Sequence, residues 1–246
     1  MIKKSAFWIL GLMMVPFFAS SQLLDSAQLL QQKFFYSIDE ALKDPDKVFR
    51  LEIKKKKLTE IPPAVFNFKN LQELNLSKNK IQKIPAEIGQ LEFLQILNLS
   101  DNEIDSISPE VSKLKHMRRL YLGSNHLTHV GNDLCEMTDL QYLDLSNNEL
   151  QRLPSHLGNL TNLRNLILNK NRIDSIPASI GSMKSLYYLD LWGNDVTFFP
   201  EDITRLKHNL KYIDMRVIAL QKEAQDAILQ QLPYTEIFFS TGCNCH

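Results

Sequence analysis

The sequence predicts an α/β solenoid, in which short coils of chain stack side by side and each coil adds one strand to a parallel sheet. Three observations predict this fold: apolar residues and an asparagine recur every 23 residues, the residues before each asparagine alternate between polar and apolar, and segments without the repeat flank it at both ends. A unit of this length cannot bury its own apolar face, so it must stack on its neighbours.

The repeat is clearest from Leu71 onward, where stretches such as LQILNLSDNEIDSIS (94–108) recur at a constant spacing. Numbered from its first apolar residue, each copy is apolar at positions 1, 4, 6, 11, 14, 18 and 21. Position 9 is asparagine in Asn79, Asn102, Asn125, Asn148, Asn171 and Asn194. An amide side chain has a donor and an acceptor, so we expect these residues to satisfy backbone groups where the chain leaves the sheet. Each such group costs about 1–3 kcal/mol if it is buried unpaired.

Positions 3 to 7 of each copy form the predicted strand. In Glu73–Ser77 (ELNLS) two leucines alternate with polar residues, as in a strand with one buried face. Positions 3, 5 and 7 therefore face away from the core, on the outer surface of the sheet.

The pattern LxxLxLxxNxLxxIPxxIGxLxxL, found over residues 48–215, resembles the 23-residue type of leucine-rich repeat, as in exported bacterial members. The resemblance implies a right-handed, curved solenoid of about eight repeats (48–218), with a concave parallel β-sheet, a convex side of short helical or extended turns, and usually a protein-binding role. Ser108 and Gly131 replace the proline that other copies have at position 15, which leaves the convex path of those two repeats open. Lys56 and Ile218 replace the asparagine in the end repeats, which are expected to be atypical.

Residues 1–21 read as a signal peptide. Lys3 and Lys4 precede an apolar core over residues 6–18, and small residues follow it. That core is shorter than the roughly 20 residues of a membrane span, so we expect cleavage and export, with no stable membrane span afterwards. The destination would be the periplasm, the cell surface or the extracellular space. An uncleaved anchor is the alternative.

Two further segments are expected to cover the open ends of the solenoid. Residues 22–47 form the predicted N-terminal helical cap, in which Ser37–Glu40 matches a capping box and Pro45 ends the helix. Residues 219–246 form the predicted C-terminal cap and tail, with helical spacing over 219–232 and a last strand in TEIFF (235–239). One extra residue within 207–209 marks the transition to this cap.

Neither a metal site nor a cofactor is predicted from the cysteines and histidines. Cys135 occupies position 19, where other copies carry a small residue. Cys243, Cys245 and His246 have the ligand types for a soft metal but lack a fourth ligand and a rigid frame, so a frayed tail or an intermolecular disulfide is the preferred interpretation.

We predict no enzymatic activity. The sequence contains neither a glycine-rich phosphate loop nor a metal-spaced histidine pair, and a solenoid of this size offers no deep cleft. His126 lies at position 10, where successive copies differ in charge, so a row of exposed ionic pairs accounts for it without chemistry.

Charge excludes one class of partner and leaves another open. Lysine plus arginine and aspartate plus glutamate number 28 each, so bulk charge does not favour nucleic-acid binding. The run Lys54–Lys57 could bind an acidic partner, an anionic glycan or a membrane surface, but a solvated surface is the simpler interpretation.

The outer surface of the sheet carries the candidate ligand-binding residues. Positions 3, 5 and 7 of the C-terminal copies are unusually aromatic, with arginine and aspartate beside them, as in binding hot spots. These residues are Arg119, Tyr121, Tyr142, Asp144, Ile167, Tyr188, Asp190, Trp192, Tyr212 and Asp214. The alternative is that aromatic residues merely favour strands and stack on one another.

The sequence therefore predicts an exported, non-enzymatic module that binds a protein or peptide of unknown identity on its concave face. A glycan or polyanion ligand at the cell surface and a purely structural role in the cell envelope are the alternatives.

Overall fold

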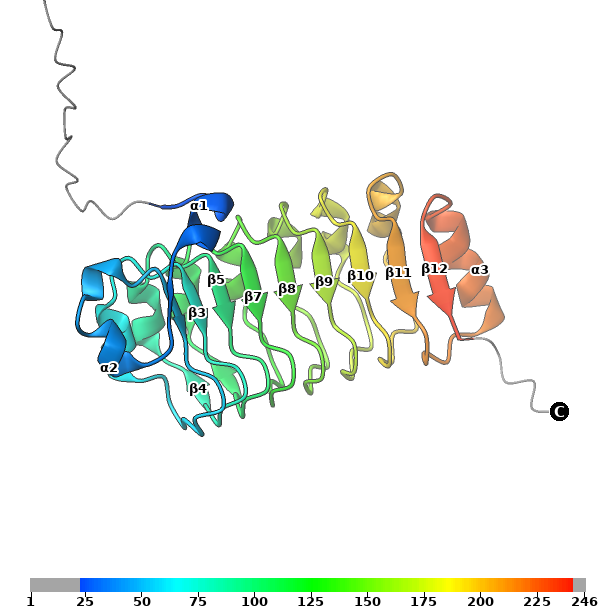
Figure 1. The fold of residues 1–246 in the computed structure, drawn as a ribbon. Helices are drawn as coiled ribbons and strands as arrows, with labels where there is room; N and C mark the ends of the chain where they lie inside the picture. The colour runs from blue at the N-terminus through cyan, green and yellow to red at the C-terminus, as the bar shows by residue number, and fades with distance from the viewer. Residues whose placement is uncertain (1–22, 241–246) are drawn as a thin grey trace, which may run out of the picture.

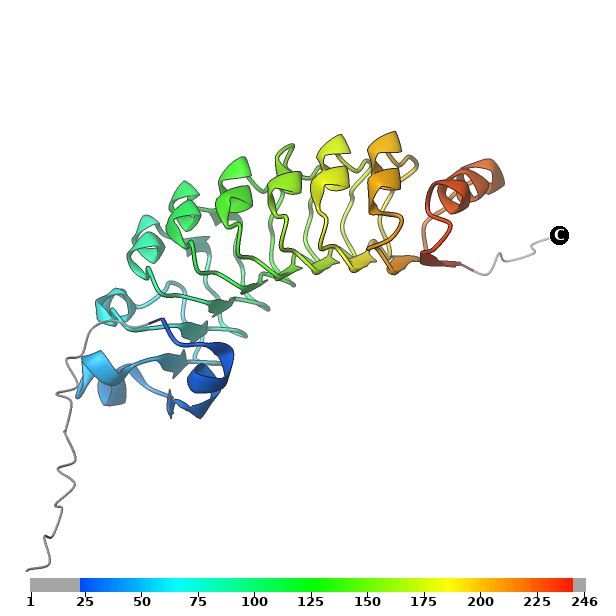
Figure 2. The ribbon, with the colours of Figure 1, turned by 90° about the horizontal axis from the view of Figure 1, so that it is seen from above.

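A computed structural model describes residues 23–240 of the chain. The predicted signal peptide (1–21) and the group Cys243, Cys245 and His246 lie outside the described residues. The described part forms an arc, in which a parallel sheet lines the concave side and short helical turns line the convex side (Figures 1 and 2). This architecture confirms the predicted α/β solenoid with a concave parallel sheet.

Ten strands of residues 23–240 form the main sheet, in the order β1-β2-β3-β5-β7-β8-β9-β10-β11-β12. Eight of them come from the repeats: β2 (Arg50–Glu52), β3 (Glu73–Asn75), β5 (Ile96–Asn98), β7 (Arg119–Tyr121), β8 (Tyr142–Asp144), β9 (Asn165–Ile167), β10 (Tyr188–Asp190) and β11 (Tyr212–Met215). Equivalent positions of successive repeats pair with one another, as Leu74 does with Leu97. A second parallel pair, β4 (Lys83–Ile84) and β6 (Ser106–Ile107), runs beside the sheet.

The core is one continuous column of leucine and isoleucine side chains. Those at positions 4 and 6, such as Leu97 and Leu99, are fully or almost fully buried. Because each coil packs only on its neighbours, the column continues without a break along the arc.

The position-9 asparagines bond the backbone of two coils at once. In Asn102 the side-chain Nδ2 donates to the carbonyls of Leu99 (2.9 Å) and Leu76 (3.1 Å), and Oδ1 accepts from the N–H of Ile81 (3.0 Å). Equivalent bonds recur in each of the six asparagines, all of which are buried. The row links every repeat to the one before it.

The residue just before each asparagine adopts the left-handed backbone conformation. The φ angles at this position 8 lie between 49° and 67° in Lys55, Lys78, Asp101, Ser124, Asn147, Lys170 and Gly193, and Val217 follows the same rule in the last repeat. Glycine favours this region and other residues rarely adopt it, yet only Gly193 is glycine. This feature was not predicted from the sequence, because Asp101, Asn147 and Gly193 favour the left-handed region but lysine, serine and valine stand at the same position in other repeats.

The convex side consists of 3-10 helices: η2 (Pro63–Asn67), η3 (Ala86–Gln90), η4 (Pro109–Lys113), η5 (Asn132–Glu136), η6 (Leu157–Asn159), η7 (Ala178–Ser182) and η8 (Glu201–Leu206). The two repeats without the position-15 proline do not depart from this path. Ser108 replaces it as the N-cap of η4, where its hydroxyl accepts from the N–H of Glu110 (3.3 Å). The shortest of these 3-10 helices is η6, although its repeat has the proline at position 15.

The N-terminal segment contains α1 (Ser26–Gln31), β1 (Phe34–Phe35), α2 (Ile38–Ala41) and η1 (Pro45–Lys47). β1, which was not expected from the sequence, pairs in parallel with β2 and starts the sheet. Ser37 caps α2 by accepting from the N–H of Glu40, but the reciprocal pair of a capping box is found at Asp25 and Gln28 of α1.

The C-terminal segment contains α3 (Lys222–Gln231) and β12 (Glu236–Phe239), both inside the ranges expected from the sequence. β12 pairs in parallel with β11 and ends the sheet, and α3 lies on the convex side (Figures 1 and 2). None of the helices within residues 23–240 is long and apolar enough to cross a membrane.

Candidate binding surface

The concave face is divided into two regions by the chain itself. The N-terminal segment folds back onto the concave side of the first repeats, where α1 lies across them (Figure 2). Leu29 of α1 is buried, and only a small hollow of about 70 Å³ remains between α1 and the sheet. We call the concave side of β2, β3 and β5 the covered half, and that of β7 to β11, from Tyr121 onward, the open half.

Side-chain amides of the sheet bind the main chain of the covering segment. The N–H of Leu24 donates to Oε1 of Gln72 (2.9 Å), and Nε2 of Gln95 donates to the carbonyl of Leu24 (2.8 Å). Farther along the same edge, Nη1 of Arg118 donates to Oγ of Ser26 (3.2 Å). The segment is therefore held by specific hydrogen bonds and not only by apolar contact.

Arg50 fixes the other end of the covering segment. Its guanidinium lies 3.8 Å from the ring centroid of Phe34, and its Nη1 donates to the carbonyls of Leu30 and Gln32. Its Nε bonds the carboxylate of Glu73 at 2.7 Å, and the arginine is only 8% exposed. A buried charge satisfied from several directions keeps this segment in place.

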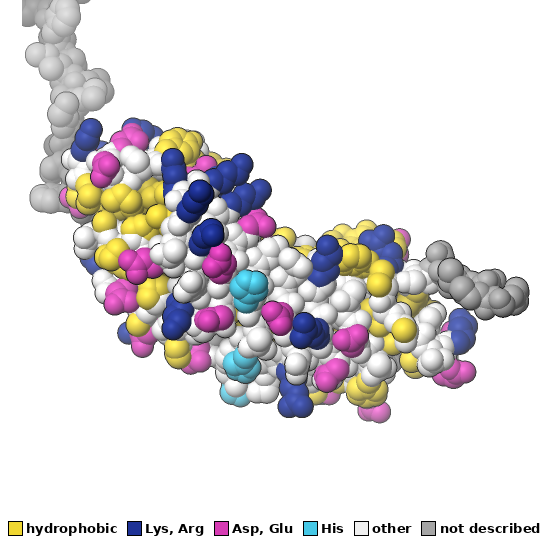
Figure 3. All heavy atoms as spheres, turned by 90° about the horizontal axis from the view of Figure 1, so that it is seen from below, with side chains coloured by type: hydrophobic (Ala, Val, Ile, Leu, Met, Phe, Trp, Pro, Cys, Tyr) yellow, Lys and Arg dark blue, Asp and Glu magenta, His cyan; other side chains and the backbone are white. Residues whose placement is uncertain are grey.

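In the open half, aromatic side chains contact one another across neighbouring strands. The rings of Tyr121 and Tyr142 lie 5.0 Å apart, and Nζ of Lys170 lies 5.1 Å from the ring centroid of Trp192. Tyr187 and Tyr212 make an edge-to-face pair at 5.4 Å. Hydrophobic side chains, tyrosines included, are visible along the concave side toward the C-terminal end in Figure 3.

Tyr187 is a member of this aromatic group that sequence reasoning missed. It stands at position 2, which was not assigned to the outer surface, and it is 47% exposed. The parallel ladder already begins at position 2, where the N–H of Tyr187 donates to the carbonyl of Arg164. Position 2 therefore projects at the edge of the sheet. A tyrosine at this position could have been assigned to the candidate binding surface from the sequence.

The residues proposed from the sequence differ in accessibility. Arg119 is exposed. Eight of the other residues are half-buried on the same face: Tyr121, Tyr142, Asp144, Ile167, Tyr188, Asp190, Trp192 and Tyr212. Asp214 is only 5% exposed, because the guanidinium of Arg216 pairs with its carboxylate (2.6 Å). A ligand would reach Asp214 only by displacing Arg216.

The aspartates at position 5 also have a local structural role. Oδ1 of Asp144, Asp190 and Asp214 accepts the N–H of the residue two further on, at 2.9, 3.1 and 3.1 Å. Asn75 and Asn98 make the same bond in the covered half. Aspartate and asparagine both suit this turn, so the acidic residues there are explained in part by how the strand ends.

Burial shifts the pKa values of several groups in the open half, and neighbouring aspartates add to the shift for the tyrosines. Burial, followed by the charge of Asp144, raises the pKa of Tyr142 to about 12. Burial and then Asp190 raise the pKa of Tyr188, and burial raises the pKa of Asp190 itself. For Asp214 burial acts in the same upward direction, but hydrogen bonds and charge from Arg216 outweigh it and lower the pKa.

The lower edge of the arc carries charges of both signs. Figure 3 shows basic side chains gathered toward its N-terminal end. The run Lys54–Lys57 follows the end of β2, and Lys54 pairs with Glu52 at 2.8 Å. At position 10, the carboxylate of Glu149 lies between two side chains, 3.6 Å from Arg172 and 4.0 Å from His126. These exposed pairs account for His126 without a catalytic role.

The described residues contain no group of three or more His, Cys, Asp or Glu side chains placed to hold a metal ion. Cys135 is buried on the convex side, and burial together with Asp133 raises the pKa of its thiol to about 12. A thiol of this kind is a small apolar side chain and not a nucleophile.

The chain is similar in sequence and structure to known leucine-rich repeat proteins. The family model for a leucine-rich repeat region matches residues 47–147 and 124–233. A leucine-rich repeat protein of Leptospira interrogans is 28% identical, with a TM-score of 0.69 over 86% of this chain and 59% of the other. Internalin C2 of Listeria monocytogenes is 22% identical, with a TM-score of 0.66 over 80% of this chain and 83% of the other.

A plant peptide hormone receptor, solved in complex with RGF2, is 21% identical, with a TM-score of 0.55 over 78% of this chain and 39% of the receptor. The chain thus spans little more than half the length of the Leptospira protein and well under half of the receptor. No curated protein matches the sequence.

Proposed function

The chain belongs to the leucine-rich repeat family, and from this premise we propose that it is a non-enzymatic interaction module that binds a protein or peptide on the open half of its concave face. The observation that carries the proposal is the asymmetry of that face. The covered half is occupied by the chain's own N-terminal segment, whereas within residues 23–240 no segment covers the aromatic pairs of the open half.

Rigidity is the proposed basis of binding. The strands of the open half are tied to the core by the buried asparagines, and their tyrosines already contact one another. Contact side chains that are ordered before binding lose little entropy on association. Tyrosine and tryptophan are also the side chains that contribute most to binding at protein interfaces.

The test is affinity capture from the native source with the chain from residue 22 onward, beside the variant Tyr142→Ala/Tyr188→Ala/Trp192→Ala. We expect a protease-sensitive partner that the triple variant no longer captures, while the circular dichroism spectrum stays unchanged. A matched control, Tyr36→Ala/Phe198→Ala/Leu229→Ala, removes three exposed apolar side chains from other surfaces. Equal capture by both variants would refute the proposal.

The glycan or polyanion alternative has its own signature. A ligand bound through Lys55, Lys56 and Lys57 would be released steeply with added salt, and their triple glutamine variant would lose it. A structural envelope component would show no partner whose capture depends on the concave face.

Export belongs to the same proposal. We propose residues 1–21 as the cleaved signal, 22–47 and 219–246 as the two terminal caps, and 48–218 as the repeats. Mass spectrometry of the protein from its native source should find an N-terminus near residue 22. An intact Met1 would indicate a retained anchor instead.

A further inference from the structure

A cluster of lysines lies at the N-terminal end of the arc, away from the open half. In Figure 1 the strands of the main sheet point toward the lower edge of the arc, so the turns that follow β2 and β3 lie at that edge. Figure 3 shows basic side chains gathered toward the N-terminal end of this side. The two turns carry five exposed lysines, which we call the basic edge: Lys55, Lys56, Lys57, Lys78 and Lys80.

The charge of the basic edge is not neutralised by ion pairs. Among residues 23–240, Lys54 pairs with Glu52, but none of the five lysines pairs with an acidic side chain. In the next repeat Asp101 and Glu103 stand where the lysines stood, and neither forms an ion pair with them. These two acidic residues therefore set the limit of the basic edge.

This pattern does not recur farther along the lower edge. Lysine occupies both position 8 and position 10 in the first two repeats, and in no later one. The sixth repeat has two cations there, but both are engaged: Nζ of Lys170 lies 5.1 Å from the ring centroid of Trp192, and Arg172 lies 3.6 Å from the carboxylate of Glu149. The first two repeats thus differ from the others in sequence and in pairing.

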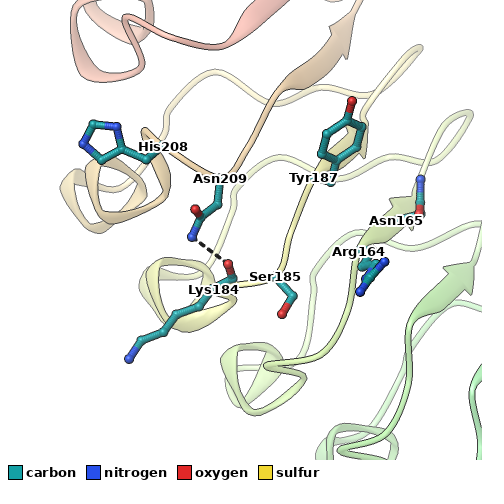
Figure 4. A pocket seen from close by; sticks show the side chains of 7 residues that line it. All are labelled: Arg164, Asn165, Lys184, Ser185, Tyr187, His208 and Asn209. Atoms are coloured by element: carbon teal, nitrogen blue, oxygen red, sulfur yellow. Dashed lines mark hydrogen bonds between the residues drawn. The ribbon is translucent and has the colours of Figure 1, made fainter.

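Cations at the opposite edge of the sheet do not form such a cluster. Arg164 and Lys184 line a hollow of about 670 Å³ where the chain enters β9, β10 and β11, but Lys184 extends away from Arg164 there (Figure 4). The carbonyl of Lys184 accepts from Nδ2 of Asn209 at 2.7 Å, while its ammonium group points outward. The two charges of this hollow therefore do not converge on one ligand.

The backbone beneath the lysines is fixed without a ligand. Oδ1 of Asn79 accepts the N–H groups of Lys56 (2.8 Å) and Leu58 (3.3 Å). The N–H of Lys80 donates to the carbonyl of Leu58 at 2.8 Å, so the two turns are bonded to each other. The buried asparagine row thus holds the turns that carry the lysines.

The repeat places like charges next to one another. Lys55 stands beside Lys78 and Lys57 beside Lys80, because equivalent residues of neighbouring repeats pair from β2 to β3. Ammonium groups on neighbouring rungs repel each other, and an anionic partner removes that repulsion. Because the whole chain has 28 basic and 28 acidic residues, the rest of it is acidic on balance. An anionic surface would therefore orient the molecule with this edge toward the charge.

The composition of the basic edge favours a plane of charge over one specific ligand. Its cations are all lysines, whose ammonium groups are point charges without the fork by which arginine binds a single carboxylate or phosphate. The two turns, residues 54–57 and 78–80, contain no aromatic residue on which a sugar could stack. Clusters of exposed lysines of this kind are attracted to anionic lipids.

We infer that the basic edge binds the surface of a membrane that contains anionic phospholipids. The lysines contact the lipid phosphates, the strands of the sheet point toward the membrane, and the concave face opens to the side, where a partner can still reach it. The inference does not rest on the proposed function, because it uses no residue of the open half.

The test is flotation of the chain from residue 22 onward with lipid vesicles. We expect binding to vesicles of phosphatidylcholine and phosphatidylglycerol in equal parts, and none to phosphatidylcholine alone. Added salt should release the chain, since the Debye length falls from about 10 Å at 0.1 M to about 3 Å at 1 M. The variant Lys55→Gln/Lys57→Gln/Lys78→Gln/Lys80→Gln should lower the partition coefficient at least about tenfold, because each lysine near an anionic surface contributes about fivefold.

Two further variants make the result specific. Arginine at the same four positions should retain binding, because the membrane surface responds to charge. The control Lys43→Gln/Lys115→Gln/Lys184→Gln/Lys207→Gln changes net charge equally at exposed positions outside the basic edge and should also retain it.

Four outcomes would each overturn the inference: equal weakening by both glutamine variants, loss of binding in the arginine variant, binding to phosphatidylcholine alone, and retention on immobilised polyphosphate without binding to vesicles. The last would identify a soluble polyanion as the ligand. Because the vesicles replace the native partner, these results can be read whatever the capture experiment shows.

Discussion

The two halves of the concave face are built from the same repeat but are used differently. In the covered half, Gln72 and Gln95 at position 2 bind the main chain of Leu24, and position 5 is asparagine in β3 and β5. In the open half, position 2 is still glutamine before β8 but is Arg164 before β9 and Tyr187 before β10, and position 5 is aspartate in β8, β10 and β11. The buried leucines and asparagines are the same in both. The repeat therefore determines the scaffold, while the side chains at the exposed positions determine where the chain's own N-terminal segment covers it.

The largest expected effect tests whether the halves share one scaffold. Leu99→Ala beneath the covered half and Leu168→Ala beneath the open half each remove a fully buried side chain. Each should lower the free energy of unfolding by about 2–5 kcal/mol through lost burial and a cavity. Urea denaturation followed by circular dichroism measures both. If only one of the two substitutions lowered the free energy of unfolding, the two halves would differ in core packing as well as in their exposed side chains.

Next in size is the attachment of the covering segment. Arg50→Ala removes its bonds to Glu73, Leu30 and Gln32, and should cost about 2–3 kcal/mol because the partners are left unpaired in a buried site. Amide hydrogen exchange should rise in residues 24–35 and stay low in β8 to β11. Uniform acceleration along the whole chain would show that the segment is integral to the fold and not a cover.

A smaller effect concerns two aspartates of the open half, Asp190 and Asp214. Their contributions to the free energy of unfolding should change with pH in opposite directions. The pKa of Asp190 is raised in the folded state, so its contribution to stability is present below about pH 3.8 and is lost as pH rises through the folded-state value. The pKa of Asp214 is lowered, so its contribution is present above about pH 3.8 and is lost as pH falls.

Unfolding free energies of wild type, Asp190→Asn and Asp214→Asn should therefore be measured between about pH 2.5 and 6. Relative to its asparagine variant, the wild type should become less stable with rising pH for Asp190 and more stable for Asp214. Slopes of the same sign would show that Arg216 does not govern Asp214.

The smallest expected change concerns Cys135, which lies on the convex side in the middle of the solenoid. Its pKa of about 12 leaves almost no thiolate at pH 8, so an alkylating reagent should not modify it in the folded protein. The measurement is mass spectrometry of a Cys243→Ser/Cys245→Ser variant. Protection should persist after Arg50→Ala, whereas rapid labelling there would mean that release of the covering segment opens the middle of the solenoid.

The repeated part of the fold was predictable because its signals are local and periodic. The spacing of Leu97, Leu99 and Asn102 determines the strand, its buried face and the turn, and the same spacing determines the pairing register. Helical spacing over 219–232 and the run TEIFF lie where the structure has α3 and β12, whereas the capping box of α1 at Asp25 and Gln28 was not recognised. The first strand, Phe34–Phe35, was not predicted either, because two residues carry no periodicity.

The division of the concave face could not have been read from the sequence. It depends on contacts between residues 71 positions apart, such as Gln95 with Leu24, and no local pattern encodes them. The same holds for Asp214, whose neighbour Arg216 lies over it in the structure. The aromatic residues of the open half were identifiable from their repeat positions, whereas their use in binding remains a proposal.

The left-handed residue at position 8 has a consequence for how such a chain diversifies. Because the neighbouring asparagine, and not a glycine, secures the turn, lysine, aspartate, serine and asparagine all occupy it, as in Lys78, Asp101, Ser124 and Asn147. The position-8 side chains of successive repeats lie next to one another along one edge of the molecule, at about the strand spacing of 4.8 Å. Substitutions at position 8 can therefore change the charge of this edge without changing the fold.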